Sequence, residues 1–357
     1  MTPERLERIL AGFEDAAIAV VGDFFLDKYL EIDPSLTETS LETGLEARQV
    51  VAVRCQPGAA GTIVSNLCAL GVGRAVCIGF VGSDGEGYEL MRALRRLGAD
   101  TSRIITHGDR FTPTYCKSLV QEPGRLRELE RLDTKNRGPL PPDLQEFLLA
   151  AVRDIAPEVD AVIAQDQVQE PDCGVVTSAM QQALAGLAVR HPGKAWFGDS
   201  RTRIGECRNL ITKPNREEAC AAVHPDSPAH DAGEAAKCGA ALSARTGRPV
   251  YLTLGSEGMA LITAAKMQPI PTARLEGRLD IVGAGDSATA GIVSALCAGA
   301  SLEEAGIVGN TVASITVQQI GTTGTASQEE VRQQFARHES VWRELPPARS
   351  AAQGRES

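Results

Sequence analysis

Residues 17–23 read Ala-Ile-Ala-Val-Val-Gly-Asp, an apolar run that stops at a glycine and an aspartate. A strand that is buried on both faces reads as a continuous apolar run, whereas a half-buried strand alternates apolar and polar residues. Similar runs recur at residues 75–80, 161–164, 195–197 and 250–254. The pattern predicts several buried parallel strands, with residues 17–21 as the first.

Helical patterns fall between most of these runs, at residues 86–97, 144–155, 175–189 and 234–246. Parallel strands need long connections, which are usually helices that cross back over the sheet. The alternation therefore predicts a doubly wound α/β fold, in which a mostly parallel central sheet carries helices on both faces.

Two segments break the alternation, residues 28–55 and 112–133. Both read as strands that lack companion helices, and we expect them to form a small β-sheet lid over the mouth of the site. The pattern favours one α/β domain over residues 1–345. Residues 346–357 are polar and rich in alanine, which predicts a disordered tail.

Composition narrows the classes of partner. The net charge is -10, from 36 Lys and Arg against 46 Asp and Glu, and only 4% of residues are aromatic. Nucleic-acid binding needs a basic surface or stacking platforms, so it is not expected. The nine cysteines form no C-x-x-C pair, which favours reduced thiols and a cytoplasmic location. We find no signal-peptide pattern and no apolar run of membrane-spanning length, so no membrane association is expected.

The most informative functional stretch reads Asp-Ile-Val-Gly-Ala-Gly-Asp over residues 280–286 and leads into a helical pattern. Backbone N–H groups at a helix N-terminus lack intrahelical partners and carry a partial positive charge. Gly283, Ala284 and Gly285 would let a phosphate approach these groups, and Asp286 would act as the base. The alternative is that the small residues only allow close packing of a strand and a helix.

The same stretch satisfies G-x-G-x-x-A, a weak dinucleotide-binding fingerprint. That motif belongs to an opening strand-turn-helix unit with an acidic residue at the end of the next strand. Here it lies late in the chain, and the acids at the corresponding distance, Glu303 and Glu304, open a helix after Ser301. A dinucleotide-binding fold is therefore disfavoured. The sequence also lacks the G-x-x-x-x-G-K-[ST] phosphate-binding loop.

A second cluster lies at residues 212–218, where an apolar run ends at a proline and a helix starts at Asn215. Asn215 with Glu218 three residues later is a capping box, which gives a purely structural interpretation. The functional alternative is that their oxygen atoms hold the water shell of Mg²⁺, a cation that keeps its waters and bridges substrate phosphates.

A third cluster, residues 253–258, follows an apolar run and places Gly255 and Gly258 in a turn. These glycines would let a nucleotide approach the backbone closely. The alternative is an ordinary hairpin turn into residues 259–263.

Together and in this order, the three clusters resemble the signature set of the ribokinase/PfkB family of small-molecule kinases. The resemblance extends over residues 20–327, and its spacing is most similar to that of the bacterial heptose-phosphate kinases. It includes the glycine-containing turns at residues 57–62 and 79–87. The resemblance implies a ribokinase-like fold and an ATP-dependent kinase that phosphorylates a hydroxyl of a sugar or sugar phosphate.

The resemblance also implies roles for single residues. Asp286 would be the general base, and residues 283–285 would form the anion hole for the transferred γ-phosphoryl group. Asn215 and Glu218 would organise Mg²⁺ through water. The residues implied to border ATP are Asn215, Thr253, Gly255, Gly258 and Asn310. The residues implied to bind the acceptor are Asp27, Gly58, Ala59, Thr62, Asp166, Arg131 and Asp133.

The chain departs from the family pattern at the acceptor end. The usual double glycine of the early turn is Gly58-Ala59 here, and the asparagine usually found shortly after it is Thr62. These changes alter hydrogen bonding to the acceptor, so the sequence leaves the acceptor open. It also leaves open whether a monovalent cation orders the loop around Asp280 and Thr325.

Two other functions remain as alternatives. A nucleoside kinase would use the same family site, and the aromatic residues near the acceptor end are available to stack on a base: Phe24, Phe25, Tyr29 and Tyr115. A catalytically silent relative that only binds a ligand need not retain Asp286, Asn215 and Glu218 together, as this chain does. The lid further implies a homodimer.

Overall fold

The computed structural model of the protein describes residues 1–122, 125–224, 232–343, 345 and 348–350. A ten-stranded sheet forms its centre. The strand order is β14-β13-β12-β11-β10-β9-β8-β1-β4-β5. Its strands are β1 (Ala17–Gly22), β4 (Arg74–Gly82), β5 (Asp100–His107), β8 (Ala161–Asp166), β9 (Ala195–Ser200), β10 (Ile211–Thr212), β11 (Val250–Thr253), β12 (Met259–Ile262), β13 (Lys266–Ile270) and β14 (Arg349–Ser350).

The strands from β11 across to β5 run parallel, and β12, β13 and β14 extend the other edge in antiparallel pairing. Each of the five predicted apolar runs lies in one of the parallel strands, except that Leu254 follows the end of β11. The prediction of a mostly parallel α/β sheet is therefore confirmed.

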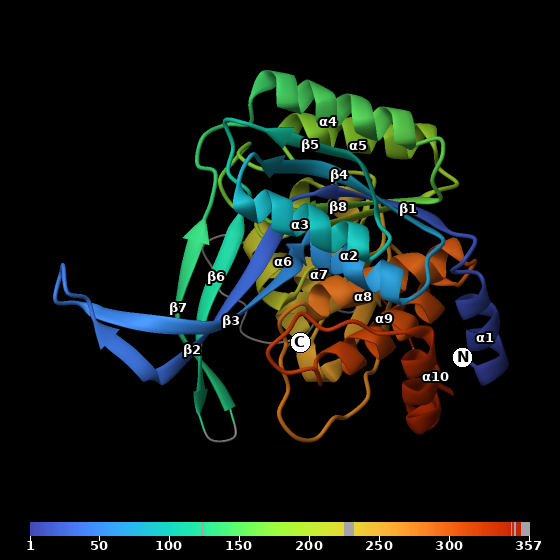
Figure 1. Ribbon diagram of the computed structural model, residues 1–357. Helices are drawn as coiled ribbons and strands as arrows, with labels where there is room; N and C mark the ends of the chain where they lie inside the picture. The colour runs from blue at the N-terminus through green and yellow to red at the C-terminus, as the bar shows by residue number, and fades with distance from the viewer. Residues whose placement is uncertain (123–124, 225–231, 344, 346–347, 351–357) are drawn as a thin grey trace.

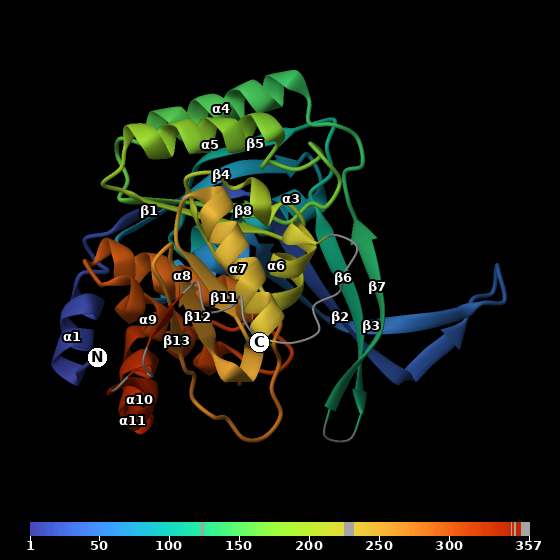
Figure 2. The same cartoon turned by 180° about the vertical axis from the view of Figure 1, so that it is seen from behind.

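Helices cover both faces of this sheet, as Figures 1 and 2 show from opposite sides. On one face lie α1 (Pro3–Ala11), α2 (Ala60–Ala69), α3 (Gly85–Arg96), α8 (Ala284–Cys297), α9 (Leu302–Thr316) and α10 (Gln328–Arg337). On the other face lie α4 (Pro142–Ile155), α5 (Ser178–Arg190), α6 (Arg216–Val223) and α7 (Ala232–Thr246). The short helices η1 (Ile204–Glu206), η2 (Gly255–Glu257) and α11 (Glu339–Arg343) complete the elements of this unit.

The position of β1 between two helical layers explains its continuous apolar run. Ile18 and Val20 belong to the core on the α8 side, whereas Ala19 and Val21 belong to the core on the α4 side. Successive side chains of a strand point to opposite faces, so a strand between two helical layers needs an apolar residue at every position.

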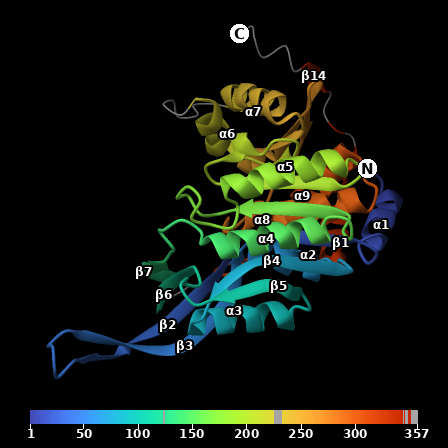
Figure 3. The same ribbon diagram turned by 90° about the horizontal axis from the view of Figure 1, so that it is seen from above.

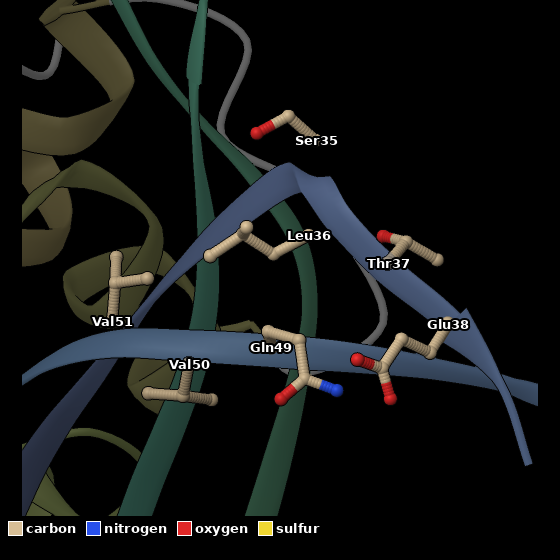
Figure 4. Close-up of a pocket in the computed structure, with 7 residues that line it drawn as sticks. All are labelled: Ser35, Leu36, Thr37, Glu38, Gln49, Val50 and Val51. Carbon is tan, nitrogen blue, oxygen red and sulfur yellow. The ribbon is translucent and has the colours of Figure 1, made fainter.

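A second sheet has the order β3-β2-β6-β7 and stands apart from the main sheet, as expected for the lid. Its strands are β2 (Phe24–Thr39), β3 (Glu46–Ala59), β6 (Thr114–Glu122) and β7 (Arg125–Thr134). The far ends of β2 and β3 continue beyond β6 and β7 as a two-stranded arm that projects from the body (Figure 1). Figure 4 shows a hollow on this arm, lined by residues 35–38 and 49–51.

The tail differs from expectation at two residues. Arg349 and Ser350 form β14, which pairs with Met267 and Lys266 at the open edge of β13. An edge strand offers unpaired N–H and C=O groups, so even a polar segment can join it. The rest of the predicted tail, residues 346–347 and 351–357, lies outside the described residues. Within the described part, no helix is both long and apolar enough to cross a membrane.

Candidate active site

The N-terminal half of α8 lies over the carboxyl ends of β8 and β9. In the first turn of α8, the Asp286 carboxylate accepts a hydrogen bond from Gln165 at 3.3 Å, and Gln165 is the penultimate residue of β8. One turn later, Thr289 donates to Asp199 of β9 at 3.1 Å. In an open parallel sheet, ligands bind outside the carboxyl ends of the strands, which is where the contacts with Gln165 and Asp199 place the start of this helix. Figure 3 shows the strands of the second sheet beside the body of the protein.

The start of α8 has the geometry of an anion site. Gly283 caps the helix in the left-handed conformation, with a φ of 78°. The Ala284 N–H donates to the Ile281 carbonyl at 3.2 Å. Among the described residues we find no acceptor for the N–H groups of Gly285 and Asp286. These two groups, rather than that of Ala284, are therefore the donors available to a phosphate.

A buried ion pair lies beneath this first turn. Lys213 is only 4% exposed, and its ammonium lies 2.9 Å from the Asp199 carboxylate. A Cβ built at Gly285 would lie 3.2 Å from the Lys213 Nζ atom. The missing side chain of Gly285 thus lets a positive charge approach the available N–H groups.

Burial and the charges around Asp286 bring its pKa close to neutral pH. Burial, followed by repulsion from Asp199, raises the pKa of Asp286 to about 7, although Lys213 and Arg201 oppose the shift. A general base works best when its pKa lies near the pH at which the enzyme operates. The geometry and acidity of Asp286 both suit proton abstraction.

The second cluster forms the N-terminus of α6. Asn215 caps the helix by accepting from the Glu218 N–H at 2.8 Å, and the Glu218 carboxylate accepts from the Asn215 N–H at 2.9 Å. The predicted capping box is therefore present. Asn215 also pairs with Thr253 in an isolated β-bridge, so the second and third clusters are neighbours.

The same region suits a cation. Burial and the Asp199 carboxylate raise the pKa of Glu218 to about 7, because a further negative charge is unfavourable there. No group of three metal-ligating side chains is present in the described part of the chain. Mg²⁺ usually binds one or two carboxylates and fills its remaining positions with water and substrate phosphate oxygens. Glu218 and Asn215 suit this water-mediated mode of binding. The described residues do not offer enough side-chain ligands for a cage made only of protein groups.

The third cluster turns β11 into β12. Gly255 has a φ of 63° and no atom within 4 Å of the Cβ position, so its surroundings are open. Gly258 has a φ of 89°, and a Cβ there would lie 2.3 Å from the Ile270 carbonyl oxygen. The predicted hairpin turn is confirmed, because β11 and β12 pair in antiparallel register. The tight turn at Gly258 leaves an open surface at Gly255.

Asn310 lies in α9 and supports the segment that follows β13. It is 5% exposed, and its side-chain amide donates to the carbonyls of Ile270 and Pro271 at 2.9 and 3.1 Å. Ile270 also closes against Gly258. Asn310 therefore fixes the backbone behind the turn.

The residues expected to bind the acceptor surround the start of the lid. Asp27 lies in β2, and a Cβ at Gly58 of β3 would lie 2.7 Å from its carboxylate. Thr62, in the first turn of α2, would meet a Cβ at Gly283 at 3.2 Å. The expected acceptor and phosphate residues are thus brought together, although more than 200 residues separate them along the chain.

Ala59 is a strained position. Its φ of 53° and ψ of -117° fall where glycine is usual, just before α2 begins. The family pattern has a glycine at this point. The chain keeps the backbone conformation while carrying a side chain that opposes it.

One face of the lid carries two rows of polar and aromatic side chains. Strand register aligns the first row as Gln56, Asp27, Tyr115 and Asp133, and the second as Arg54, Tyr29, Lys117 and Arg131. Gln56 bonds Thr322 at 2.7 Å, so this face is turned toward the body of the protein. Lys117 lies 3.7 Å from Asp27, and burial raises the pKa of Asp27 although Lys117 opposes it.

Two of the implied acceptor residues form a pair within the lid. Arg131 donates two hydrogen bonds to Asp133, at 2.7 and 2.8 Å, and its guanidinium lies 4.4 Å from the centre of the Tyr115 ring. This fork geometry holds the guanidinium in one orientation.

Asp166 is engaged in a buried network. Both of its carboxylate oxygens accept from Arg203, and one also accepts from Ser200 at 2.6 Å. Burial raises the pKa of Asp166 to about 6, and Arg203 limits the rise. Asp166 thus holds Arg203 at the carboxyl edge of the sheet.

The loop before α8 is tied to the chain after α9. Asp280 accepts from the N–H groups of Val282 at 3.1 Å and of Gly321 at 2.9 Å. The Thr325 carbonyl accepts from the Gln319 side chain at 2.7 Å. The two residues considered for a monovalent cation thus serve as local hydrogen-bond acceptors.

Three site residues were given no role by sequence reasoning: Gln165, Asp199 and Lys213. Each stands among polar residues at the end of a short apolar run; Lys213 lies inside the second cluster without a role of its own, and no motif includes Gln165 or Asp199. The available signal was positional, because polar residues at the carboxyl ends of adjacent parallel strands gather at one edge. Using it requires the strand order, which the sequence does not give.

Comparison with known proteins identifies the family. Residues 18–329 match the pfkB family carbohydrate kinases. The chain is 30% identical over 350 residues to the bifunctional protein HldE of Gluconobacter oxydans, covering 96% of this chain and 69% of the relative. It is 29% identical over 331 residues to HldE of Desulfatibacillum aliphaticivorans, covering 90% and 64%. The chain spans about two thirds of the length of these relatives.

Solved structures share the fold. Phosphofructokinase-2 from Escherichia coli in complex with potassium has a TM-score of 0.69 at 18% identity, covering 90% of this chain and 98% of that chain. Ribokinase of Arabidopsis thaliana complexed with ribose and ATP has a TM-score of 0.66 at 19% identity, with the same coverage. Because the family match spans most of its length, this chain belongs to the pfkB family of carbohydrate kinases, phosphotransferases that use a hydroxyl group as acceptor.

Proposed function

We propose that the protein is an ATP- and Mg²⁺-dependent kinase that phosphorylates a hydroxyl of a sugar phosphate, with Asp286 as the general base. The observation that carries this proposal is the first turn of α8. There a carboxylate with a pKa of about 7, two available N–H groups and the buried Lys213 ammonium converge. These are the parts that phosphoryl transfer requires, since the protein mainly positions groups and stabilises charge.

The reaction follows from this arrangement. The acceptor hydroxyl passes its proton to Asp286 as its oxygen forms a bond to the γ-phosphorus, and the bond from that phosphorus to the β,γ-bridging oxygen breaks to release ADP. The N–H groups of Gly285 and Asp286 and the Lys213 ammonium stabilise the charge on the transferred group. Mg²⁺ held through water by Asn215 and Glu218 would neutralise the nucleotide phosphates.

We propose that ATP lies along Thr253, Gly255 and Gly258. The open surface at Gly255 and the adjacent Asn215 support this site, since the metal cluster and the turn are neighbours. Asn310 acts through the backbone it holds, because both of its amide hydrogen bonds go to residues 270 and 271.

The lid supports a phosphorylated acceptor. We propose that Asp27, with Gly58, Ala59 and Thr62 around it, binds sugar hydroxyls, and that Lys117 and Arg131 bind a phosphate group on the same molecule. These two cations are neighbours in one strand register, beside Asp27. Asp133 and Asp166 act indirectly, by holding Arg131 and Arg203.

A nucleoside acceptor has less support. The centre of the Tyr29 ring lies 4.7 Å from the Arg54 guanidinium and 4.9 Å from the Lys117 ammonium. The Tyr115 ring is covered by Arg131. A ring face that carries a cation is not free to stack on a base.

A coupled assay of ADP release tests the proposal over a panel of sugars, sugar phosphates and nucleosides. We expect sugar phosphates to give the highest kcat/KM, and Asp286→Asn to lower kcat by about 10²- to 10⁴-fold. Full activity of that variant would overturn the assigned mechanism. Lys117→Met should raise KM for a sugar phosphate by about tenfold and raise KM for the unphosphorylated sugar by less, since Lys117 also neighbours Asp27.

We further propose that residues 1–345 act as one kinase unit in the cytoplasm, where the free thiols stay reduced. Its partner would be a second copy of the chain, bound through the lid.

A further inference from the structure

Gln165 occupies the centre of the site. It pairs with Gly22 of β1 on one side and with Asp199 of β9 on the other, so all three lie in one row across the sheet. Registered neighbours point to the same face, and the Asp199 carboxylate reaches α8 on that face. Gly22 contributes no side chain, and a Cβ there would lie 2.3 Å from the Gln165 carbonyl oxygen.

The amide of Gln165 is only half used. Gln165 is 4% exposed, and its Nε2 atom donates to Asp286 at 3.3 Å. Its Oε1 atom is buried and has no hydrogen-bond partner among the described residues. In the ionised form that acts as the base, the Asp286 carboxylate only accepts hydrogen bonds, so the nitrogen faces Asp286 and the unpartnered atom is the oxygen. Leaving a buried carbonyl unpaired is unfavourable, and a bound ligand that donates a hydrogen bond to it would recover this loss.

We propose that Gln165 is a catalytic residue that orients Asp286 through Nε2 and accepts, through Oε1, a hydrogen bond from a hydroxyl next to the one that reacts. This inference rests on the proposed role of Asp286. It defines the acceptor more narrowly, as a sugar that presents two neighbouring hydroxyls to the site. Oxygen atoms on adjacent carbons lie within the span of a carboxylate and an amide that already contact each other.

Other charged groups near Asp286 cannot replace this contact. Asp199 and Lys213 are paired with each other beneath the helix, and Asp27 faces Lys117 in the lid. Arg201 acts on Asp286 by charge, from the chain that follows β9. None of these pairs supplies a neutral acceptor atom beside the base, so the Gln165 amide has a role of its own.

The test replaces Gln165 by methionine, which keeps the length of the side chain and removes both polar atoms. The assay uses the sugar phosphate that the panel above ranks first. We expect kcat to fall about tenfold or more and KM for the acceptor to rise about tenfold, with KM for ATP unchanged. Gln334→Met is the matched control, since Gln334 is similarly buried and donates its hydrogen bond to Ser314, which is not one of the proposed site residues. It should lower stability and leave both KM values unchanged.

Monodeoxy derivatives of the same acceptor isolate the second hydroxyl. Removing the hydroxyl that Gln165 binds should lower kcat/KM about tenfold in the wild type and have little further effect in Gln165→Met. If the two losses simply multiply for every derivative, Oε1 does not contact the acceptor and the inference is wrong. If Gln165→Met does not fold, Gln165→Glu decides, because it keeps the acceptor oxygen but repels Asp286. Unchanged kcat in that variant would overturn the inference.

Asp286→Asn, measured in parallel, separates the two hypotheses. If that variant is inactive while Gln165→Met behaves as wild type, only the role of Gln165 fails. If Asp286→Asn stays active, the general-base assignment itself fails.

Discussion

At the scale of single residues, the site holds more negative charge than its surroundings favour. Asp286, Asp199 and Glu218 gather around one buried cation, Lys213. Burial opposes the charge on Lys213, yet these carboxylates outweigh it and raise its pKa. The pKa values of Asp286 and Glu218 rise to about 7, first because both carboxyls are buried and second because Asp199 repels their charge. Such opposed charges at one place are typical of a catalytic site rather than of a structural ion pair.

The pH dependence of activity follows from Asp286. The base works only when it is ionised, so kcat/KM should rise with pH through an acid limb near pH 7. A pH series of the coupled assay at saturating Mg²⁺ measures this limb. A limb near pH 4 would mean that Asp286 keeps the ordinary acidity of an aspartate and would contradict the account of its surroundings.

Stability should depend on Asp286 in the opposite sense. The folded protein retains a proton on Asp286 up to about pH 7, whereas the unfolded chain loses it near pH 4. Stability is therefore lost as the pH rises through this window. Asp286→Asn should melt about 2 °C or more above the wild type at pH 8 in EDTA, and the difference should shrink at pH 5. Equal melting temperatures at both pH values would show that Asp286 carries no such cost.

Strain at Ala59 gives a further prediction. With a φ of 53°, this alanine carries about 1–3 kcal/mol of backbone strain. Ala59→Gly should raise the free energy of unfolding by about 1 kcal/mol, after the added entropy of the unfolded chain is subtracted. Urea unfolding measures the change. The control is Ala60→Gly, one residue later in helical conformation, which should be destabilising.

At the scale of elements, we propose two purposes for one helix start. The capping box of α6 satisfies its own first turn, and Glu218 and Asn215 in it are the residues that we propose hold Mg²⁺ through water, beside Thr253. The sequence showed both interpretations as alternatives, and the structure makes them compatible. In this proposal the cap holds the oxygen atoms in place for a hydrated cation that bridges to phosphate.

Substitution of the caps separates the two purposes. Asn215→Ala should cost about 1 kcal/mol of stability, as should Ser327→Ala in the equivalent capping box of α10. Only Asn215→Ala should also raise the Mg²⁺ concentration needed for half-maximal activity. Titration of Mg²⁺ at fixed ATP measures this requirement. If both variants behave alike, the cap of α6 has no part in holding the metal.

At the scale of the whole molecule, the lid and its arm project from the body and leave apolar side chains exposed. Val51 and Val53 of β3 lie in the lid and are 58% and 55% exposed. Leu36, in β2, is also exposed beside the hollow on the arm (Figure 4). Apolar residues that gather on a projecting strand pair favour association with another protein surface.

The lid should mediate a homodimer. Val51→Lys combined with Val53→Lys should convert a dimer into a monomer, because two buried charges would oppose the contact. Light scattering coupled to size-exclusion chromatography measures the mass. The control is Val189→Lys on α5, where a valine of 65% exposure lies away from the lid. A wild-type protein that is monomeric at micromolar concentration would contradict the proposal.

Local patterns were enough to predict much of this protein. The continuous apolar runs predicted the parallel strands, because a strand between two helical layers has no polar face. The cap signals at Asn215 and the glycines at 255 and 258 predicted a helix start and a turn, because those preferences act within a few residues. The motifs also provided the family resemblance, and this resemblance predicted kinase activity.

Only the tertiary structure decided how these parts meet. Strand order and register brought Gly22, Gln165 and Asp199 into one row, and residues far apart in sequence became neighbours by pairing. The tertiary structure also set the pKa of Asp286, because its burial and its repulsion from Asp199 depend on residues that are distant in the sequence. The sequence by itself determined the elements and the reaction class, because both rest on local patterns. The partners of each charge depended on the packed structure, because electrostatic and desolvation effects act through space.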